Sequence, residues 1–577
     1  MGFDINKPSG SRLVKNMGKA FAGLFVKKFP EPQYKKITEE EVRIRMRDGV
    51  ELSGFVYRPD KEGRFPVILV RNPYISGQMV YGGVLPFFAQ QGYCCVLVSV
   101  RGALKSGGEW LPFEHETDDG YDIIEWIASQ DWCDGNIGSY GQSYSGFVQW
   151  AVAGCGHPAL KTMFIEVSGA TPYEVFWRRG MFRMDVWTIW ACTMMGKNRL
   201  KFMPPKPKEI DKGIRMLPQK DFPIKWYGEE AEWYQNWIRN EKPTDPYWSE
   251  GFWGHMQRSV KHMRIPVMMQ GGWFDPFFRP EMNTFRILPE DVRKKSRFLI
   301  GPWNHGGSKV GDIELPNEKR DSAIFTREAL YWFNYQLKGL PYPYRTGVVE
   351  AYEVRTGNWV IYDGDLKADK ALKVYTCADG TLSFDGTVSS GKVKFEYDPE
   401  DPVETICGNA LNNDGKNGGL GSKLQRKSGE RSDVVSFVSG PLQEDITICG
   451  AIEADLYVGS DKPATAFTVV VSEVEPDGKA YNIRDDITDI RWKTDDIFEA
   501  YEPGEVAHLH LSMNDISWVV RKGNALRVDV SSSNFPLYSK HFNSTEPWYS
   551  LTEGKTAQQT IYCGGEHPTH ITIPVRK

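Results

Sequence analysis

The chain has 577 residues, 41% of them hydrophobic and 25% charged, and its formal net charge is −5 at pH 7. This composition is ordinary for a globular protein and gives no reason to expect a disordered chain, and the length suits about two to four globular domains. The weak negative charge gives no basis for binding nucleic acid or an anionic membrane, so we expect neither as a partner.

The nine cysteines are scattered along the chain, with no C-x-x-C pair and no spacing typical of a zinc site. We therefore expect reduced thiols in a cytoplasmic protein, without a metal or a cofactor. The sequence contains no apolar run of about 18 residues, the length that a transmembrane helix needs. A basic amphipathic stretch between Arg12 and Lys28 lacks a signal-peptide cleavage site. We expect it to form a surface helix in an N-terminal extension, residues 1–40.

Strand and helix patterns alternate in the first part of the chain. Apolar and polar residues alternate over residues 41–57 around an Asp-Gly turn, which predicts a β-hairpin. Residues 65–70 and 93–100 are apolar runs typical of strands buried on both faces. Helical spacing of apolar residues follows them, over residues 84–91 and 118–129. This order predicts an α/β fold, with a mostly parallel sheet covered by helices on both sides.

The segment Gly141-Gln142-Ser143-Tyr144-Ser145-Gly146 lies between a short strand-like stretch and an apolar helix-like stretch. Such surroundings are typical of a nucleophile elbow, a strained turn that projects a serine hydroxyl from the carboxyl edge of a sheet. The next backbone N–H, that of Tyr144, can then help to bind an oxyanion. The second glycine comes one position later than in G-x-S-x-G. For this segment alone, an ordinary strand-to-helix turn remains the alternative.

Residues 169–260 are dense in Trp, Phe, Met and Arg, and Pro-rich connectors interrupt them. Amphipathic stretches at residues 176–183, 187–190 and 233–237 favour helices. We therefore expect a helical cap, inserted into the α/β core and covering an active site.

The strand pattern resumes with buried runs at residues 265–273 and 297–302. The core is thus expected to comprise residues 41–168 and 261–345. Short strands separated by Asp-Gly turns then continue to the C-terminus, and they predict an antiparallel β-sandwich over residues 346–577.

A serine hydroxyl becomes a good nucleophile when a base takes its proton and a carboxylate orients that base. In an α/β hydrolase the acid and then the histidine follow the serine, on loops after later strands. Asp275 and His305 each come directly after a predicted buried strand. Taken alone, Asp275 could be a turn or capping residue, and His305 a loop histidine bound by backbone groups. Because open α/β sheets place active sites at the carboxyl ends of strands, the three residues together predict a catalytic triad.

Several stretches of the chain match one family. They are Arg71-Asn72-Pro73-Tyr74, Val100-Arg101-Gly102, Ser106-Gly107-Gly108-Glu109, Trp132-Cys133-Asp134-Gly135-Asn136-Ile137-Gly138, the serine motif, Gly272-Trp273-Phe274-Asp275, Gly301-Pro302-Trp303-Asn304-His305, and Pro441-Leu442 with Asp445. From residue 41 to its end, the chain resembles the cocaine esterase / X-Pro dipeptidyl-peptidase family of serine hydrolases. The family's own serine motif is G-x-S-Y-x-G, which accounts for the late glycine. The resemblance implies an α/β-hydrolase core, an inserted helical cap and a C-terminal jelly roll.

The resemblance also implies roles for individual residues. Ser143 would be the nucleophile, His305 the general base and then acid, and Asp275 the residue that orients the histidine. Tyr74 matches the family tyrosine whose hydroxyl joins the Tyr144 N–H in the oxyanion hole. A turn aromatic packed on the core is the alternative for Tyr74.

One position departs from the family pattern. Ser99 stands where the family commonly has an acidic residue before Val-Arg-Gly. Arg101 therefore lacks this local partner, and another group must take its place.

The expected reaction is acyl transfer to water, with a small-molecule ester or a short peptide as substrate. The family's peptidase and amino-ester branches recognise a free α-ammonium group with carboxylates, whereas residues 276–280 are apolar and then basic. We therefore expect an esterase. An X-Pro dipeptidyl aminopeptidase is the alternative if Glu174 or Asp185 supplies an ammonium site, and a catalytically silent binding protein is a further one. A homo-oligomer is compatible with the sequence, which does not decide the oligomeric state.

Overall fold

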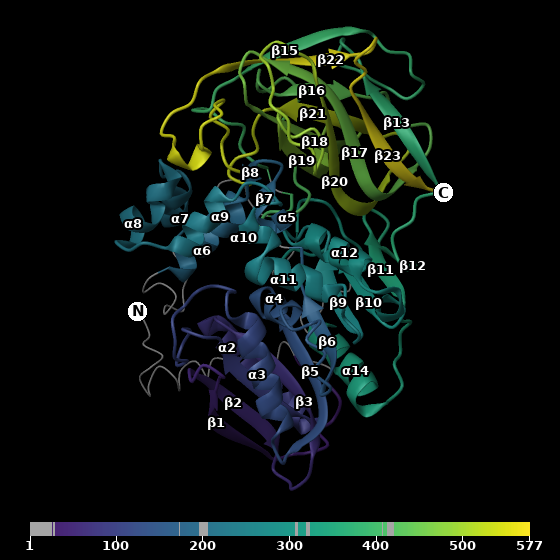
Figure 1. Cartoon of the computed structure of the whole chain (residues 1–577). Helices are drawn as coiled ribbons and strands as arrows, with labels where there is room; N and C mark the ends of the chain where they lie inside the picture. Colours follow the sequence, from purple (N-terminus) through teal and green to yellow (C-terminus); the bar gives the residue numbers. More distant parts are fainter. Residues whose placement is uncertain are drawn as a thin grey trace.

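The computed structural model describes residues 26, 29–171, 173–195, 206–305, 310–318, 324–406, 408–411 and 420–577. The surface helix expected between Arg12 and Lys28 falls, but for residue 26, outside these ranges. Figure 1 shows three regions: an α/β core at the bottom, a helical region in the middle and to the left, and a β-rich region at the top.

Among the described residues, ten strands form one mixed sheet in the order β1-β2-β4-β3-β5-β6-β9-β10-β11-β12. From β4 to β11 in this order, neighbouring strands run parallel, and the strands at both edges are antiparallel to their neighbours. The strands are β1 (Ile37–Arg45), β2 (Glu51–Pro59), β3 (Phe65–Asn72), β4 (Cys94–Ser99), β5 (Cys133–Gln142), β6 (Leu160–Glu166), β9 (Val267–Gly272), β10 (Arg297–Gly301), β11 (Val348–Glu353) and β12 (Asn358–Asp363).

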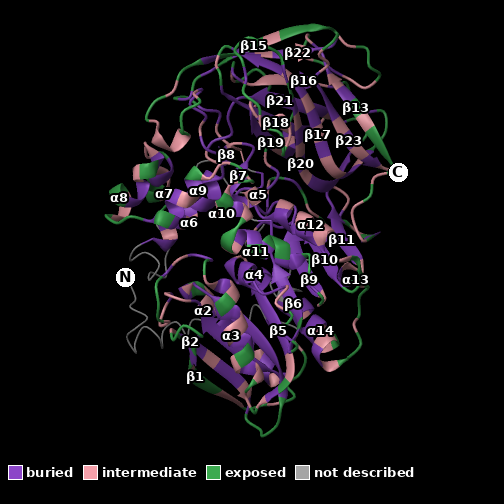
Figure 2. Cartoon of the chain, in the orientation of Figure 1, coloured by how far each residue is buried: buried purple, intermediate pink, exposed green. Residues whose placement is uncertain are grey.

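Helices cover both faces of the central strands. Successive side chains of a strand point to opposite faces, so neighbouring residues enter different clusters. In β3, Ile68 belongs to a cluster with α2 (Ile75–Gln90) and α14 (Ile324–Lys338), whereas Val67 belongs to one with α3 (Glu116–Ala128). Figure 2 shows the central strands almost wholly buried. Burial on both faces explains why these strands are continuous apolar runs.

The hairpin predicted over residues 41–57 is confirmed, because β1 pairs with β2 in antiparallel register. Gly49 in its turn has a φ of 89°, which glycine adopts without strain. The helix predicted over residues 84–91 begins earlier, at Ile75, and continues through Pro86.

The chain leaves the sheet after β6 and returns at β9, and the residues between form the predicted helical cap (Figure 1). Its helices and helical turns are α5 (Tyr173–Phe176), η1 (Met184–Thr188), α6 (Ile189–Met194), α7 (Pro207–Ile214), η3 (Gln219–Asp221), α8 (Phe222–Tyr227), α9 (Glu232–Arg239), α10 (Pro246–Ser249) and α11 (Gly251–Val260). The helix expected over residues 176–183 is wrong, because β7 (Trp177–Arg178) and β8 (Met181–Phe182) form a small hairpin there. Arg178 in this hairpin pairs with Asp486 of the β-rich region at 2.6 Å. A distant partner thus overrides the local helical pattern.

Antiparallel strands make up the β-rich region. One sheet contains β13 (Lys370–Thr376), β14 (Leu382–Ser383), β15 (Gly391–Tyr397), β17 (Ile446–Ser460), β20 (Ala507–Val520), β22 (Ala557–Cys563) and β23 (His570–Arg576). The other contains β16 (Val435–Val438), β18 (Ala466–Val474), β19 (Ala480–Asp489) and β21 (Ala525–Ser531). An α/β core, an inserted cap and a C-terminal antiparallel region confirm the predicted fold class. The jelly-roll topology stays a prediction.

The first strands after residue 346 differ from expectation, because β11 and β12 extend the core sheet instead of the sandwich. By pairing with β10, β11 covers backbone groups that would otherwise lie at a sheet edge. Glu350 of β11 pairs with Arg297 of β10 at 2.5 Å. This ion pair allows a strand that contains glutamate to be buried in the core.

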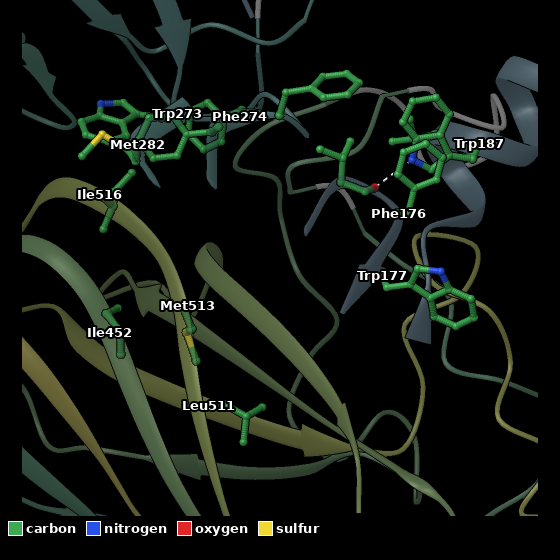
Figure 3. Packing of buried hydrophobic residues seen from close by; sticks show 14 of the residues in the cluster. Phe176, Trp177, Trp187, Trp273, Phe274, Met282, Ile452, Leu511, Met513 and Ile516 are labelled. Atoms are coloured by element: carbon green, nitrogen blue, oxygen red, sulfur yellow. Dashed lines mark hydrogen bonds between the residues drawn. The ribbon is translucent and has the colours of Figure 1, made fainter. Parts of the chain in front are cut away.

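A continuous apolar cluster joins the three regions. Figure 3 shows Trp273 and Phe274 from the core, Trp187 from the cap and Met513 from β20 within this cluster. The loop after β9, which carries Asp275, therefore lies against both the cap and the β-rich region. Its neighbour Phe277 packs edge-on against Trp187, with ring centroids 6.3 Å apart.

The described ranges contain no helix that is both long and apolar enough to cross a bilayer. The eight cysteines named within those ranges are all free thiols. In the same part of the chain, His, Cys, Asp and Glu side chains form no group of three or more that could hold a metal ion.

Candidate active site

Ser143 lies at the sharp turn between β5 and α4 (Tyr144–Trp150). Its φ of 57° and ψ of −123° are strained for a residue with a side chain, at a cost of about 1–3 kcal/mol. The Ser143 N–H donates to the Glu166 carbonyl at 3.0 Å, and the Ser143 carbonyl accepts the N–H groups of Gly146 and Phe147. The turn is thus held from both sides, with the serine at the carboxyl edge of the sheet.

The two glycines of the motif allow close packing around this turn. A Cβ at Gly146 would lie 2.6 Å from the Ser168 Cβ, and one at Gly141 would lie 2.4 Å from the Ser145 Cβ. Both distances are too short for carbon atoms. Gly146 is the residue at which α4 meets the segment after β6. A glycine is therefore needed at position 146 and not at position 145.

A chain of hydrogen bonds joins Ser143, His305 and Asp275. The His305 Nε2 lies 2.9 Å from the Ser143 Oγ, and the His305 Nδ1 lies 2.8 Å from Asp275 Oδ2. A carboxylate only accepts hydrogen bonds, so Nδ1 carries the proton of the neutral ring and Nε2 is free to accept the serine proton. The Asp275 side chain is fully buried, whereas 15% of the His305 side chain is exposed.

The loop that carries Asp275 is fixed by backbone and by distant groups. Asp275 Oδ1 accepts the Phe277 N–H at 2.7 Å, so both carboxylate oxygens have partners. The Asn409 side-chain amide donates to the carbonyls of Trp273 and Asp275, at 3.0 and 2.8 Å. Arg183 of the cap in turn donates to the Asn409 carbonyl at 2.8 Å. The loop is thus tied to both other regions of the chain.

A second buried carboxyl lies near Asp275. Burial, and then the negative charge of Asp275, raise the pKa of Glu281 well above its usual range. Glu281 Oε1 accepts the Ser168 N–H at 3.1 Å. The raised pKa favours the neutral form of Glu281, which adds no second negative charge to this buried region.

The side chain of Tyr144 is anchored away from the serine. Its hydroxyl lies 2.9 Å from Glu116 Oε1 and accepts the Phe113 N–H at 2.9 Å. Glu116 also pairs with Arg71 at 3.1 Å. Burial raises the pKa of Glu116 to about 7, and the Arg71 charge opposes the rise. As the first residue of α4, Tyr144 has a backbone N–H that the helix itself leaves unsatisfied.

Tyr74 comes shortly after β3 and lies beside the turn that carries Ser143. Its ring meets the Tyr144 ring edge-on, with centroids 6.2 Å apart and planes at 80°. Asn72 holds the Tyr74 backbone from both sides, because its side chain donates to the Tyr74 carbonyl at 2.7 Å and accepts the Tyr74 N–H at 3.2 Å. The Tyr74 hydroxyl accepts a hydrogen bond from the Trp190 indole of the cap, at 2.9 Å.

Arg101 has carboxylate partners despite the serine at position 99. Its guanidinium pairs with Asp119 of α3 at 2.5 Å and with Asp48 of the β1–β2 turn at 2.6 Å. The Ser99 carbonyl accepts a hydrogen bond from the Ser106 hydroxyl at 2.6 Å. The missing local acid is thus replaced by two acids from other elements.

Aromatic side chains surround the hydrogen-bonded residues. Phe277 packs against the His305 ring with centroids 5.0 Å apart. Phe113 stacks on the Tyr144 ring at 4.4 Å, and Trp190 lies parallel to that ring at 6.4 Å. Aromatic packing of this kind keeps water away from the hydrogen-bonded residues and so strengthens the electrostatic interactions between them.

The two cap carboxylates considered for an ammonium site both have partners. Glu174 accepts hydrogen bonds from Thr171 at 2.7 Å and from Asn283 at 2.6 Å. Asp185 pairs with Arg183 at 2.9 Å and accepts the Leu411 N–H at 2.9 Å. Asp185 thus has a protein cation as its partner, whereas Glu174 accepts hydrogen bonds from two neutral groups.

Trp190 and Asn409 were not among the residues expected at the site. Each residue lies in a remote part of the chain and contacts the site through one side-chain hydrogen-bonding group. Neither residue belongs to a sequence motif. Only the docking of the cap and of the β-rich region reveals them.

Two family models match the chain. They are X-Pro dipeptidyl-peptidase (S15 family), over residues 48–307, and X-Pro dipeptidyl-peptidase C-terminal non-catalytic domain, over residues 345–572. The chain belongs to the cocaine esterase / X-Pro dipeptidyl-peptidase family of serine hydrolases. The cocaine esterase of Rhodococcus sp. (strain MB1 Bresler) is 28% identical over 575 residues, which cover 93% of this chain and 98% of that protein. Membership of the family makes the protein a serine hydrolase that acts on esters or dipeptides.

Solved structures share the fold over nearly the whole length. An aminopeptidase from the marine sediment archaeon Thaumarchaeota archaeon has a TM-score of 0.80 at 21% identity, covering 96% of this chain and 99% of its own. An α-amino acid ester hydrolase has a TM-score of 0.78 at 21% identity, covering 95% and 98%. At these identities the likeness concerns the fold, in which core, cap and β-rich region recur together.

Proposed function

We propose that the protein is a carboxylic ester hydrolase that forms an acyl-enzyme on Ser143, with His305 and Asp275 completing a catalytic triad. The observation that carries this proposal is the unbroken hydrogen-bonded chain from the Ser143 hydroxyl through the His305 ring to Asp275, at 2.9 and 2.8 Å. Both distances lie within the range needed for proton transfer between a nucleophile and its base.

The geometry supports a two-step reaction. His305 Nε2 takes the serine proton while Ser143 Oγ attacks the ester carbonyl, and the proton then passes to the leaving alcohol. In the second step His305 deprotonates a water that attacks the acyl-enzyme, and the proton returns to the serine as it leaves. Asp275 stays ionised throughout and stabilises the histidine cation formed in each step.

Two donors are proposed to bind the oxyanion, the backbone N–H of Tyr144 and the hydroxyl of Tyr74. The first is supported by its place at the unsatisfied start of α4, directly after the serine. The second is supported by the position of Tyr74 against Tyr144 at the end of a neighbouring strand.

Replacing Tyr74 by phenylalanine should lower kcat by about 100- to 1000-fold, because it removes one oxyanion donor and keeps the ring. KM should change little, since the lost bond is strongest in the transition state. The measurement is steady-state hydrolysis of a p-nitrophenyl ester. Tyr335→Phe, an exposed tyrosine of α14, is the matched control. A Tyr74→Phe enzyme as active as this control would exclude the hydroxyl from the oxyanion hole.

An ester is proposed over an X-Pro peptide because the two cap carboxylates have hydrogen-bonding partners in the protein and the acid loop continues into an arginine. Glu174 and Asp185 are engaged by neighbouring protein groups, and Arg279 follows the acid loop in place of a carboxylate. The aromatic lining formed by Phe277, Trp190 and their neighbours favours an uncharged substrate.

We expect hydrolysis of a p-nitrophenyl ester with a high kcat/KM and little release of p-nitroaniline from an X-Pro-p-nitroanilide. The two substrates are compared at equal enzyme concentration, with Ser143→Ala as the blank for each. Faster cleavage of the X-Pro anilide would reverse the assignment and make the protein a dipeptidyl-peptidase.

A cytoplasmic location belongs to the same proposal. It is supported by the free thiols of the described ranges, most of which are buried, since oxidising compartments favour disulfides. The weak negative net charge of −5 likewise gives no support for a nucleic-acid or membrane partner.

A further inference from the structure

One side chain of the cap contacts the Tyr74 hydroxyl. Trp190 lies on α6, and its indole Nε1 is 2.9 Å from the Tyr74 oxygen across 116 residues of sequence. An indole N–H can only donate, whereas a phenol carries one proton and accepts through its lone pairs. The direction of the bond is therefore fixed, with Trp190 donating and Tyr74 accepting.

We propose that Trp190 is a positioning residue of the oxyanion hole, which aims and polarises the Tyr74 hydroxyl. This inference rests on the proposed function, in which Tyr74 donates to the oxyanion. With one lone pair occupied by the indole, the phenol proton must point away from Trp190. The proton thereby remains available to a carbonyl oxygen bound above Ser143.

The bond also strengthens the donor. Accepting a hydrogen bond from Trp190 draws electron density out of the Tyr74 oxygen, so its O–H becomes a better donor, by about 10–30% per bond in a chain. The gain is largest when the acceptor carries negative charge, as the oxyanion does. Trp190 should therefore stabilise the transition state more than the bound substrate, without touching the reacting atoms.

Both partners are held in place before substrate arrives. The Trp190 ring lies nearly parallel to the Tyr144 ring, at 8° and 6.4 Å, and stacks on Phe113 at 6.1 Å. Trp233 of α9 packs edge-on against it at 5.9 Å. Asn72 fixes the Tyr74 backbone through the two bonds described above. Preorganisation of this kind is what gives an oxyanion donor its catalytic effect.

The test is a double-mutant cycle on p-nitrophenyl ester hydrolysis. Trp190→Phe keeps an aromatic ring and removes the N–H, and it should lower kcat by about 3- to 10-fold while KM stays within about twofold. In a Tyr74→Phe background the same substitution should cost nothing further, because the acceptor is gone. Trp126→Phe, which alters a ring of α3 that packs against Trp132 in a different cluster, is the matched control and should keep the kcat of the parent enzyme.

Inhibition by phenylboronic acid gives a second readout. Its tetrahedral serine adduct mimics the transition state, so its inhibition constant should rise by the factor by which kcat falls. If Trp190→Phe proves unstable, β-benzothienylalanine at position 190 keeps the bicyclic shape and replaces the N–H by sulfur.

The possible outcomes separate the two proposals. If Tyr74→Phe is harmless, the oxyanion role of Tyr74 fails and this inference fails with it. If Tyr74→Phe is damaging but Trp190 variants keep full kcat, only the role of Trp190 is overturned. Equal losses from Trp190→Phe with and without the Tyr74 hydroxyl would show a purely structural role for the tryptophan.

Discussion

Ser143→Ala is expected to abolish hydrolysis of a p-nitrophenyl ester, with a loss in kcat of about a million-fold. No other group replaces the Oγ that lies 2.9 Å from His305 Nε2. Acyl-enzyme formation is then impossible, and what remains is the small effect of oxyanion stabilisation on attack by water. Labelling by a fluorophosphonate, which reacts with activated serines, should disappear together with turnover.

Ser129→Ala serves as the control for this experiment. Ser129 is an exposed serine directly after α3, so its loss should leave both turnover and labelling intact. Unchanged ester hydrolysis by Ser143→Ala would refute the proposed mechanism. Absence of fluorophosphonate labelling in the unmodified protein would instead favour the silent binding protein.

Asp275→Asn should lower kcat by about 10⁴-fold, although the residue has almost the same shape. Asp275 Oδ1 accepts the Phe277 N–H at 2.7 Å, so the amide oxygen of an asparagine is held at that position. The amide NH₂ then faces His305 Nδ1, where the carboxylate Oδ2 now lies. Nδ1 must become an acceptor, and the ring proton moves to Nε2. Nε2 can no longer take the serine proton.

The measurement compares kcat for Asp275→Asn with kcat for Asp118→Asn. Asp118 is an exposed residue of α3 that pairs only with an exposed arginine, and its substitution should have no effect. The melting temperature of each variant checks that the fold survives. If the Asp275→Asn enzyme keeps a tenth or more of the parent kcat, the tautomer of His305 is not controlled by this carboxylate.

The positions of Ser143, Asp275 and His305 could be foreseen because each follows a strand that is visible as an apolar run. Parallel strands bring their carboxyl ends to one edge, so sequence order and strand ends were enough to suggest a meeting point. The role of Tyr74 could not be predicted from its position alone, since an aromatic residue after a strand is common. Only the resemblance to a family assigned it a role.

Trp190 and Asn409 could not be foreseen, because their contacts depend on how separate regions dock. Trp190 lies 116 residues from Tyr74, and Asn409 lies 134 residues from Asp275. Trp190 contributes one indole N–H and Asn409 one amide NH₂ group, and a lone group of this kind leaves no periodicity or spacing in the sequence. The β7–β8 hairpin escaped prediction for the same reason, since the partner of Arg178 lies in β19.

The strands directly after residue 346 were expected in the sandwich, and they join the core sheet for a different physical reason. The two glutamates of β11 make the strand resemble a solvent-exposed one, yet all of its residues are buried. Glu350 is buried because Arg297 of the neighbouring strand neutralises it. A sequence pattern that counts charges cannot detect a charge partner on another strand.

The side-chain amide of Asn409 limits which hybrids can be made by exchanging the β-rich region between related proteins. It holds two carbonyls of the loop that carries Asp275, although the two lie in different regions of the fold. A hybrid that joins this core to the β-rich region of a relative would keep its loop geometry only if the incoming segment presents an equivalent donor. We therefore expect residues 408–411 and the loop after β9 to tolerate exchange only as a pair, although they are far apart in the chain.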